Sequence, residues 1–384
     1  MIKTYISEPF LDQREKKSLL LSLKRNEIST FGKSVKTFEK KSSKITEAKY
    51  NLALNSGSAG LLIAFKSIGI NKNDIVLTQS YTFIATISSI LHTGATPWIF
   101  DLNNQDFNLD LTKIEKQLKA KCIKKGNYYY HKKSKKRIFA ICPVFSFSII
   151  PNLEEINSFA KKFNLKVIFD AACSFGAKYK DLSVTKFADI SIFSFNGNKS
   201  LTTGAGGLLS TNNKTLFIRA EKLSQNGKNI NKNYTYDVIG HNYKMSNLHA
   251  SIGISQIKKF GEIKLKKNRV SQIYERAFVK KNIKILPKTK NSNYILWINC
   301  IICKNKNQTK RIISRLNELQ IESKFFWKPM HKQINIKNKL IIDRNLKFTD
   351  LIWDRIVTLP SSPNLKRSVQ ARIISEINKI WKKN

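Results

Sequence analysis

Residues 191–207, SIFSFNGNKSLTTGAGG, place a single lysine just after an apolar run and surround it with small, neutral residues. The apolar run is typical of a strand that helices cover on both faces. Surface lysines usually lie on helices among other charges, but Lys199 stands in a segment with almost none. The stretch therefore predicts either an ordinary loop lysine or an amine held at the end of a sheet strand for chemistry.

Outward from this stretch, short apolar runs alternate with longer segments of helical spacing. The runs are NDIVLTQS, ATPWIFDL, RIFAICPVF, LKVIFDAA, DISIFSF and GGLLST. Between them lie segments such as SAGLLIAFKSI, LTKIEKQLKAK and NLEEINSFAKKF, which carry the helical pattern. Alternating strands and helices indicate an α/β domain with a mostly parallel sheet.

The pattern changes past about residue 250. A long amphipathic stretch, HASIGISQIKKFGEIKLKKNRVSQIYERAF, predicts one connecting helix. Short strands in YILWINCIIC, a helix and a terminal helix follow it. We therefore expect a large α/β domain over residues 1–250, and a connecting helix with a smaller α+β domain over residues 251–384.

The charge of the chain is strongly unbalanced. Its 384 residues include 69 basic and 26 acidic ones, for a net charge of +43. Such a field favours anionic partners, and nucleic acid is one interpretation. Lysines run along the whole chain, however, which favours a general compositional bias. The basic, tyrosine-rich residues 122–137 are open to the same two interpretations, and we favour a solvated loop or extended hairpin.

The N-terminal sequence carries no signal-peptide pattern, and no apolar run approaches the length of a membrane span. The five cysteines are few and lie mostly in apolar surroundings, which indicates reduced thiols. Cys300 and Cys303 form a lone CxxC without a second Cys or His pair, so no metal site is expected. We expect a cytoplasmic protein that does not insert into membranes.

A phosphate site is one interpretation of residues 55–59. Small residues at a helix N-terminus leave backbone N–H groups facing an anion, and Gly57, Ser58 and Ala59 stand there. The alternative is that Ser56 and its neighbours only cap the helix.

An acid and a nucleophile come at the ends of two predicted strands. Asp170 ends VIFD, at an edge where open α/β sheets bind ligands. A buried acid there needs a partner, such as a cationic ring nitrogen, unless it merely caps the next segment. Lys199, held among neutral groups, is a usable amine nucleophile that can form a Schiff base. Ser194 offers a hydroxyl to a phosphate oxygen, unless both residues belong to a plain polar loop.

Together these groups match the needs of pyridoxal 5′-phosphate. That cofactor takes a phosphate cradle, an acid for its pyridine nitrogen and a Schiff-base lysine. Phe83, in QSYTFIAT, is suited to stack on the ring, although it also suits an ordinary core position.

The sequence resembles the DegT/StrS-type nucleotide-sugar aminotransferases, which are fold-type I pyridoxal phosphate enzymes. The motifs that carry the resemblance are NSGSAGL, QSYTFIAT, FDAACSFGAKYKD, FSFNGNKSLTTGAGG and GHNYKMSNLHASIG. The resemblance implies a large domain with a mostly parallel, seven-stranded sheet. It also implies Lys199 as the Schiff-base lysine, Asp170 as the partner of the pyridine nitrogen and Phe83 as the stacking aromatic.

The resemblance further assigns residues to the cofactor phosphate. Gly57, Ser58 and Ala59 match the backbone cradle, and Ser194 matches the phosphate-binding serine. Asn242 matches an asparagine that reaches the cofactor phosphate of the neighbouring subunit, which implies a homodimer with shared sites.

Other positions concern the substrate side or depart from the family pattern. His331, in KPMHK, falls where related enzymes place a substrate-side residue. Cys173 stands beside the cofactor ring where Gln, His or Glu is usual, Phe169 replaces a Glu, and Lys244 replaces a common Arg. CPVFSFSIIPNL, residues 142–153, replaces an HxxG-like stretch. The Cys173 and 142–153 departures bear on how a substrate is oriented.

FSFNGNK and FFWKPMH most resemble members that aminate UDP-linked 4-keto-6-deoxy sugars. The resemblance thus implies amino transfer from L-glutamate to the 4-keto group of a nucleotide-linked sugar, expected to be a UDP sugar, for surface glycan synthesis. Sugar dehydratases of the same fold carry His in place of Lys199, which argues against that class. A sugar 3-aminotransferase and a basic nucleic-acid-binding or regulatory protein on this scaffold are the alternatives, and nucleic acid is the less favoured partner.

Overall fold

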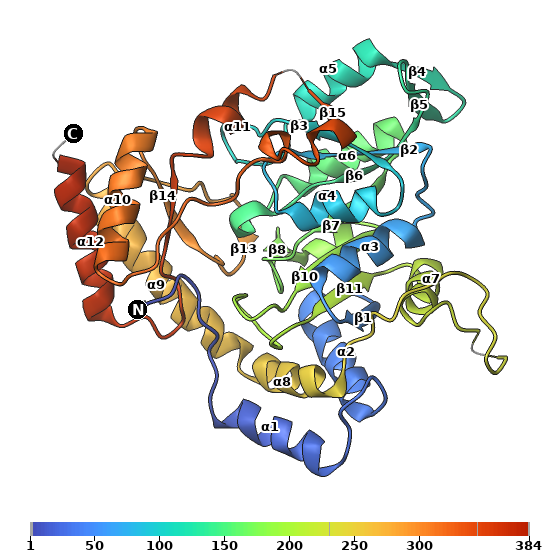
Figure 1. The fold of residues 1–384 in the computed structure, drawn as a ribbon, viewed down its shortest axis with the longest axis horizontal. Coiled ribbons are helices and arrows are strands. Elements are labelled where there is room, and N and C mark those ends of the chain that lie inside the picture. Colours follow the sequence, from blue (N-terminus) through green and yellow to red (C-terminus); the bar gives the residue numbers. More distant parts are fainter. Residues whose placement is uncertain (1–2, 230, 344, 383–384) are drawn as a thin grey trace.

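A ten-stranded sheet forms the centre of the larger of two units in the computed structural model, which describes residues 3–229, 231–343 and 345–382 (Figure 1). Its main path runs β1-β11-β10-β7-β6-β2-β3-β15. These strands are β1 (Tyr50–Leu54), β11 (Gly207–Thr211), β10 (Ile190–Ser194), β7 (Lys166–Asp170), β6 (Arg137–Cys142), β2 (Asp74–Gln79), β3 (Thr96–Phe100) and β15 (Ile341–Ile342). From β10 to β15 every pairing is parallel, whereas β11 is antiparallel to both β1 and β10.

The predicted α/β fold with a mostly parallel sheet is confirmed, and the strands predicted from the apolar runs are present. The sheet has ten strands instead of the seven that the resemblance implied, because β15 and a hairpin within residues 122–131 add to it. Helices cover both faces of the sheet, as those runs required. One face packs against α3 (Gly57–Ser67), α4 (Ile84–Leu91) and α7 (Lys214–Ser224). The other packs against α2 (Lys33–Thr46), α5 (Leu111–Lys121) and α6 (Leu153–Phe163). In β2, the side chains of Ile75 and Leu77 pack into the core beneath α2, α5 and α6, and Val76 packs into the core beneath α3, α4 and α7. The strand therefore contributes side chains to both hydrophobic cores.

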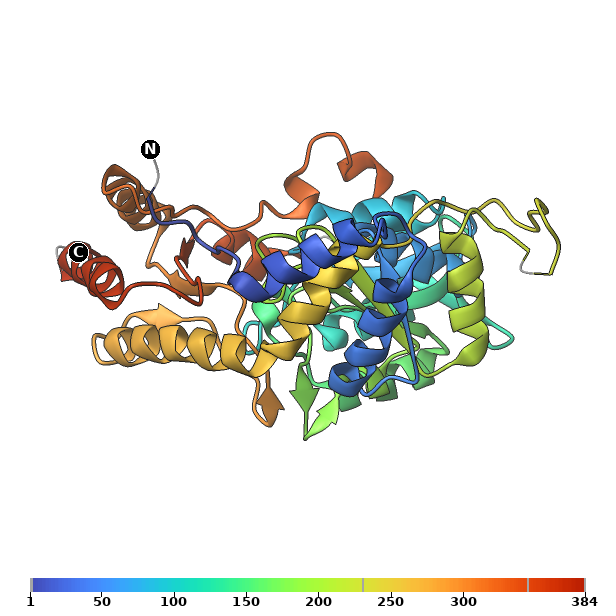
Figure 2. The same cartoon turned by 90° about the horizontal axis from the view of Figure 1, so that it is seen from below.

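The smaller unit lies beside the sheet and carries its own core (Figures 1 and 2). Its three strands are ordered β12 (Lys284–Ile285), β14 (Asn299–Ile302) and β16 (Ile356–Leu359). The helices α9 (Phe260–Val279), α10 (Lys306–Glu318) and α12 (Arg367–Lys382) pack around them. The division of the chain at residue 250 stays a prediction.

Two predicted elements differ from the structure. The connecting helix is divided into α8 (Asn247–Lys258) and α9, with a break at Lys259, whose φ and ψ are −105° and 15°. Its side chain turns at that point toward carboxylates of Asp12 and Glu15, at the start of α1 (Gln13–Lys24). In YILWINCIIC only β14 is a strand there, so Trp297 lies just before it.

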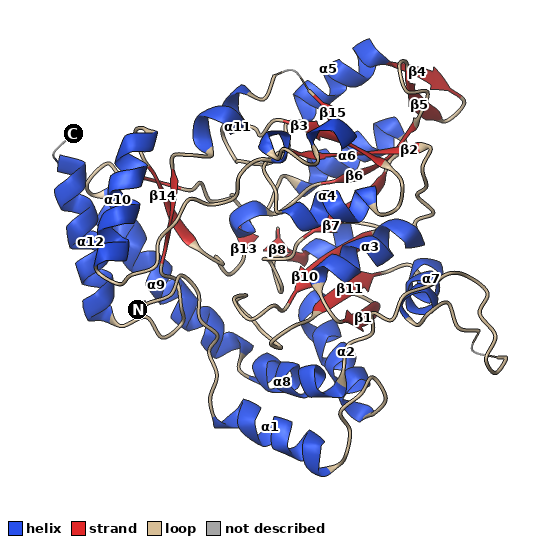
Figure 3. Ribbon diagram, viewed as in Figure 1, coloured by secondary structure: helices blue, strands red, loops and turns tan. Residues whose placement is uncertain are grey.

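The basic insert forms a hairpin, which is the interpretation favoured from the sequence (Figure 3). Its strands are β4 (Cys122–Lys125) and β5 (Tyr128–His131), and β5 joins β6. The other strands form a small sheet of β13 (Ser292–Asn293), β8 (Lys178–Tyr179) and β9 (Leu182–Ser183), and the helix α11 (Lys347–Ile352) lies between β15 and β16 in the chain.

Within the three described ranges, no helix combines the length and apolar character needed to cross a membrane. The same residues hold no group of three or more His, Cys, Asp and Glu side chains suited to a metal ion. All five cysteines are free thiols.

Candidate active site

Asp170 and Lys199 come together because two neighbouring parallel strands end at the same edge of the sheet. Asp170 is the last residue of β7, and it lies opposite Ile192 of β10. β10 ends at Ser194, and the loop that follows carries Lys199. The carboxyl ends of parallel strands are where open α/β sheets bind ligands. The two residues therefore lie at the predicted edge, and their roles toward a ligand stay predictions.

The Asp170 carboxylate is buried and held by two donors. Thr86 donates its hydroxyl to Oδ2 at 2.6 Å, and the Ala172 N–H donates to Oδ1 at 3.2 Å. Burial raises the pKa of this carboxyl, while those two hydrogen bonds and the Lys199 charge act against the rise. Asp170 does cap the next residues through the Ala172 N–H, which was the alternative from the sequence. It is also a buried carboxylate, and such a group is stabilised by a cationic nitrogen.

The Lys199 side chain is half-buried, and its amine contacts two neighbouring side chains. Its Nζ donates to Cys173 Sγ at 3.1 Å and lies 3.7 Å from the centre of the Trp297 ring. The carbonyl of Asn198 accepts hydrogen bonds from Trp297 Nε1 at 2.7 Å and from the Ser7 hydroxyl at 2.8 Å. Lys199 is therefore not an ordinary loop lysine in bulk solvent.

The start of α3 lies against the end of β10. A Cβ on Gly57 would come 2.9 Å from Ser194 Cβ, so only glycine permits this approach. Ser56 caps α3 by accepting the Ala59 N–H at 3.0 Å, which engages one of the N–H groups predicted for a phosphate. Ser58, which lies between Gly57 and Ala59 in the first turn of α3, is exposed. Ser194 and the first turn of α3 thus form one small cradle.

Phe83 and His331 occupy the side of the site formed by the loop after β2. The Phe83 side chain is 50% exposed, and its ring centre lies 5.8 Å from that of Trp327. His331 bridges Ser80 Oγ through Nδ1 at 2.6 Å and Asp350 Oδ1 through Nε2 at 2.9 Å. Both imidazole nitrogens of His331 are engaged, so its role toward a substrate stays a prediction.

The unusual stretch 142–153 supports the wall behind Cys173. Ser148 donates to the Cys173 carbonyl at 2.8 Å and accepts the Trp297 N–H at 3.1 Å. Phe147 and Ser148 adopt the left-handed backbone region, with φ of 60° and 69°. Burial raises the pKa of the Cys173 thiol, and Lys199 opposes that rise.

Asn242 follows β11 and α7 in a segment that passes the start of α3, where the Asn55 N–H donates to the carbonyl of the neighbouring Tyr243 at 2.8 Å. Asn242 is exposed, and its main chain pairs with Gln225 after α7. In the described part of this single chain, no contact joins it to Lys199 or Asp170. That placement is compatible with a role toward a neighbouring subunit, which stays a prediction.

The profile of the DegT/DnrJ/EryC1/StrS aminotransferase family matches residues 9–378. The chain belongs to this family. It is therefore a pyridoxal phosphate-dependent sugar aminotransferase, as the sequence motifs predicted.

Relatives of this DegT/DnrJ/EryC1/StrS member carry different sugar names. It is 30% identical over 378 residues to a GDP-perosamine synthase of Escherichia coli O157:H7, covering 98% of each chain. It is also 30% identical over 382 residues to the UDP-4-amino-4,6-dideoxy-N-acetyl-beta-L-altrosamine transaminase of Campylobacter jejuni serotype O:23/36, covering 97% of each chain. Among solved structures, Helicobacter pylori PseC aligns with a TM-score of 0.88 and 25% identity, over 99% of this chain and 100% of that one.

The residues of this family member fit pyridoxal phosphate. Asp170 is buried at the sheet edge with a donor on each oxygen. The absence of a side chain at Gly57 lets the start of α3 lie against Ser194, so the α3 N-terminus and the Ser194 hydroxyl are close together, as a phosphate site requires. Lys199 Nζ points to the same edge, beside Cys173.

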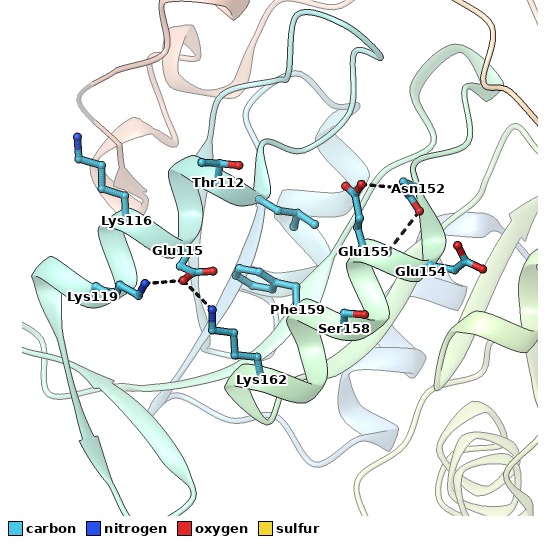
Figure 4. A pocket seen from close by; sticks show the side chains of 11 residues that line it. Thr112, Glu115, Lys116, Lys119, Asn152, Glu154, Glu155, Ser158, Phe159 and Lys162 are labelled. Atoms are coloured by element: carbon cyan, nitrogen blue, oxygen red, sulfur yellow. Dashed lines mark hydrogen bonds and ion pairs between the residues drawn. The ribbon is translucent and has the colours of Figure 1, made fainter.

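A groove elsewhere on the aminotransferase is not this site (Figure 4). It measures about 940 Å³ and lies between α5 and α6. Glu115, which lines the groove, forms ion pairs with Lys119 at 2.6 Å and with Lys162 at 2.7 Å. These three charged groups of the groove therefore have partners within the chain. None of the predicted site residues lines the groove.

Three residues that contact the candidate site were not predicted from the sequence: Thr86, Ser148 and Trp297. Thr86 is one helical turn beyond Thr82, with which it shares a hydrogen bond at 2.8 Å, so the motif QSYTFIAT held a usable signal. Trp297 looked like a buried strand residue, and no local pattern linked it to a lysine 98 positions earlier in the sequence.

Proposed function

We propose that this enzyme moves an amino group from L-glutamate to the 4-keto group of a nucleotide-linked 4-keto-6-deoxy sugar, with Lys199 as the catalytic residue. UDP is the nucleotide we expect, for synthesis of a surface glycan. The proposal is carried by one observation: the Lys199 amine and the buried Asp170 carboxylate lie at the ends of adjacent parallel strands.

The nucleotide is the least constrained part of the proposal. The relatives include one named for a GDP sugar and one named for a UDP sugar, at the same 30% identity. The FSFNGNK and FFWKPMH stretches favour the UDP-type members. The positive charge of the chain, +43, suits a substrate with a diphosphate in either case.

Each candidate residue has a distinct task. When bound, the cofactor withdraws electrons from the reacting carbon of the substrate. Asp170 would hold the pyridine nitrogen in its protonated form. Ser194 and the first turn of α3 would bind the phosphate, and Phe83 would cover one face of the ring. The Lys199 amine would take and return the proton at the carbon that gains or loses nitrogen.

We further infer a cytoplasmic homodimer in which Asn242 reaches the phosphate of the neighbouring site. Its support is the surface around Asn242, where Tyr234 and Ile239 are each 90% exposed. Large exposed side chains of this kind mark surfaces that pack against another protein.

The proposal is tested in two stages with purified protein. The holoenzyme should show a visible absorbance band that borohydride abolishes, with the label mapped to the peptide of Lys199. Lys199→Ala should lack the band, whereas Lys324→Ala, an exposed lysine on the small unit, should keep it. A label on any other lysine would overturn the assignment of Lys199.

The second stage identifies the substrate. The enzyme and L-glutamate are incubated with UDP-, dTDP- and GDP-linked 4-keto-6-deoxy sugars, and amination is read by mass spectrometry. Preference for the UDP sugars supports the full proposal, and preference for a GDP sugar overturns its nucleotide. Absence of amination on all three would remove the 4-keto sugar as the acceptor.

A further inference from the structure

Trp297 holds the Lys199 loop at two points. Its ring face lies 3.7 Å from the Lys199 Nζ. Its Nε1–H donates to the carbonyl of Asn198 at 2.7 Å. The indole is only 5% exposed, so it is a fixed surface against which both the amine and the preceding peptide rest.

The main chain of Trp297 is itself held on both sides. Its N–H donates to Ser148 Oγ at 3.1 Å. Its carbonyl accepts from the Nζ of Lys267, on α9, at 2.6 Å. The same Nζ donates to the carbonyl of Ser361, just beyond β16, at 2.8 Å. Lys267 therefore joins the Trp297 peptide to the helix and the strand end of the smaller unit.

Lys267 is a costly residue for this place. It is 1% exposed, and its two partners are neutral carbonyls. Within the described ranges no carboxylate pairs with it, and the charged or titratable group that faces it is Cys173. Burial lowers the pKa of Lys267 to about 7, which the Cys173 side chain opposes. A buried amine without a counter-ion adds little to stability, so its geometric role stands out.

We propose that Lys267 and Trp297 are positioning residues for the Lys199 amine. Lys267 fixes the Trp297 carbonyl, and the indole in turn fixes the direction of Lys199 Nζ and the carbonyl of Asn198. Because Lys267 and Ser361 belong to the smaller unit, this arrangement ties the placement of that unit to the reactive amine. The inference rests on the proposed role of Lys199.

The test compares changes at this cluster with matched changes elsewhere. Lys267→Met removes both hydrogen bonds, and Lys267→Arg retains donors for two carbonyls. Trp297→Phe keeps an aromatic ring but removes the Nε1–H, and Trp297→Leu removes the ring as well. The controls are Lys259→Met, at the other buried lysine of this helix pair, and Trp353→Phe, whose ring lies 5.6 Å from Lys306 Nζ.

The first readout uses apoprotein, so that it does not depend on turnover. Pyridoxal phosphate is added, and the rate constant for its capture at Lys199 is followed at the visible band. Displacement of a reactive group by about 1 Å slows its reaction by roughly tenfold to a hundredfold. We expect losses of that size for Lys267→Met and Trp297→Leu, a smaller loss for Trp297→Phe, and recovery in Lys267→Arg.

Three further measurements separate positioning from a merely structural role. kcat should fall with the capture rate while KM for L-glutamate stays close to that of the wild type. Lys259→Met and Trp353→Phe should retain the wild-type capture rate even if Tm falls. The Tm of each variant identifies proteins that fail to fold. If Lys267→Met and Trp297→Leu do not fold, the milder Trp297→Phe still tests the proposal.

The outcomes are distinct. Wild-type capture rates in folded Lys267→Met and in both Trp297 variants would overturn the positioning role and leave the proposed function intact. Equal slowing in the control variants would also overturn it. If the wild-type protein captures the cofactor at another lysine, the proposed role of Lys199 fails instead.

Discussion

Lys259 and Lys267 are two buried lysines eight residues apart on the α8–α9 pair, and they differ in what their amines meet. Lys259 Nζ contacts Glu15 Oε2 at 2.7 Å and Asp12 Oδ2 at 3.1 Å. Lys267 Nζ donates hydrogen bonds to the carbonyls of Trp297 and Ser361, at 2.6 and 2.8 Å, and no carboxylate of the described residues pairs with it. One amine is neutralised by acids, whereas the other is solvated by peptide dipoles.

The difference shows how partners, rather than burial, decide what a lysine contributes. The Lys259 pair fastens the start of α1 to the end of α8. Lys267 lies against the peptide that supports the candidate active site, and its pKa falls to about 7 because burial is not compensated by an acid. The first lysine should therefore govern stability, and the second should govern geometry and pH response.

The largest expected effect comes from breaking the Lys259 site. Lys259→Met leaves the Glu15 carboxylate, which is 5% exposed, without its cation. Removing one partner of a buried pair costs about 3–5 kcal/mol of unfolding free energy. Denaturant unfolding measures this loss, with Lys258→Met, at the exposed neighbouring position, as control. A similar loss in both variants would erase the contrast.

The next effect concerns pH at the Lys267 site. Between about pH 7 and 10.5 the unfolded chain holds a proton that folded Lys267 has released, so its contribution to stability increases with pH. The slope is at most about 1.4 kcal/mol per pH unit. The free-energy cost of burying the protonated Lys267 amine is full below about pH 7 and absent above about pH 10.5.

The unfolding free energies of the wild type and Lys267→Met, measured at pH 7, 8 and 9, test this slope. The difference between them should move in favour of the wild type as pH rises. Lys259→Met supplies the comparison, since the Lys259 amine is paired with the Glu15 and Asp12 carboxylates instead of with neutral carbonyls. A pH-independent difference for Lys267→Met would show that its amine is not the cause.

A double substitution tests whether Lys259 and Glu15 stabilise the fold as an ion pair. Glu15→Gln alone should cost about 1–3 kcal/mol, the range for a buried group that loses its best partner. Glu15→Gln combined with Lys259→Met should be less damaging than the sum, because no uncompensated charge remains. Additive losses in a double-mutant cycle would mean that the two side chains act independently.

The smallest effect is expected at Asp12, which is 30% exposed. Arg14 holds the pKa of the Asp12 carboxyl well below its usual range, with a further contribution from Lys259. The stability that the ionised Asp12 carboxylate contributes is present at neutral pH, and it is lost as pH falls below the usual range of an Asp carboxyl. Asp12→Asn should remove this acid-range loss from a Tm–pH profile, and added salt should weaken the wild-type dependence.

Much of this molecule was readable from local sequence. The apolar runs predicted the strands, and the strand ends predicted that Asp170 and Lys199 would meet. Trp297, Ser148 and Lys267 were not predicted, because segments about 30 to 150 residues apart bring them together. The break at Lys259 was hidden because a single residue interrupts an unbroken helical pattern, and its cause lies at the distant Asp12 and Glu15.

The two-residue strand β15 adds to the large sheet from near the end of the chain, beside β3. A recombinant fragment that stops near residue 250 would therefore leave the Trp98–Ile99 edge of β3 with open backbone groups. Uncovered edges of this kind invite pairing with other chains. Dissection of the enzyme for crystallography or NMR would gain from retaining residues 330–343, or from a polar substitution along that edge.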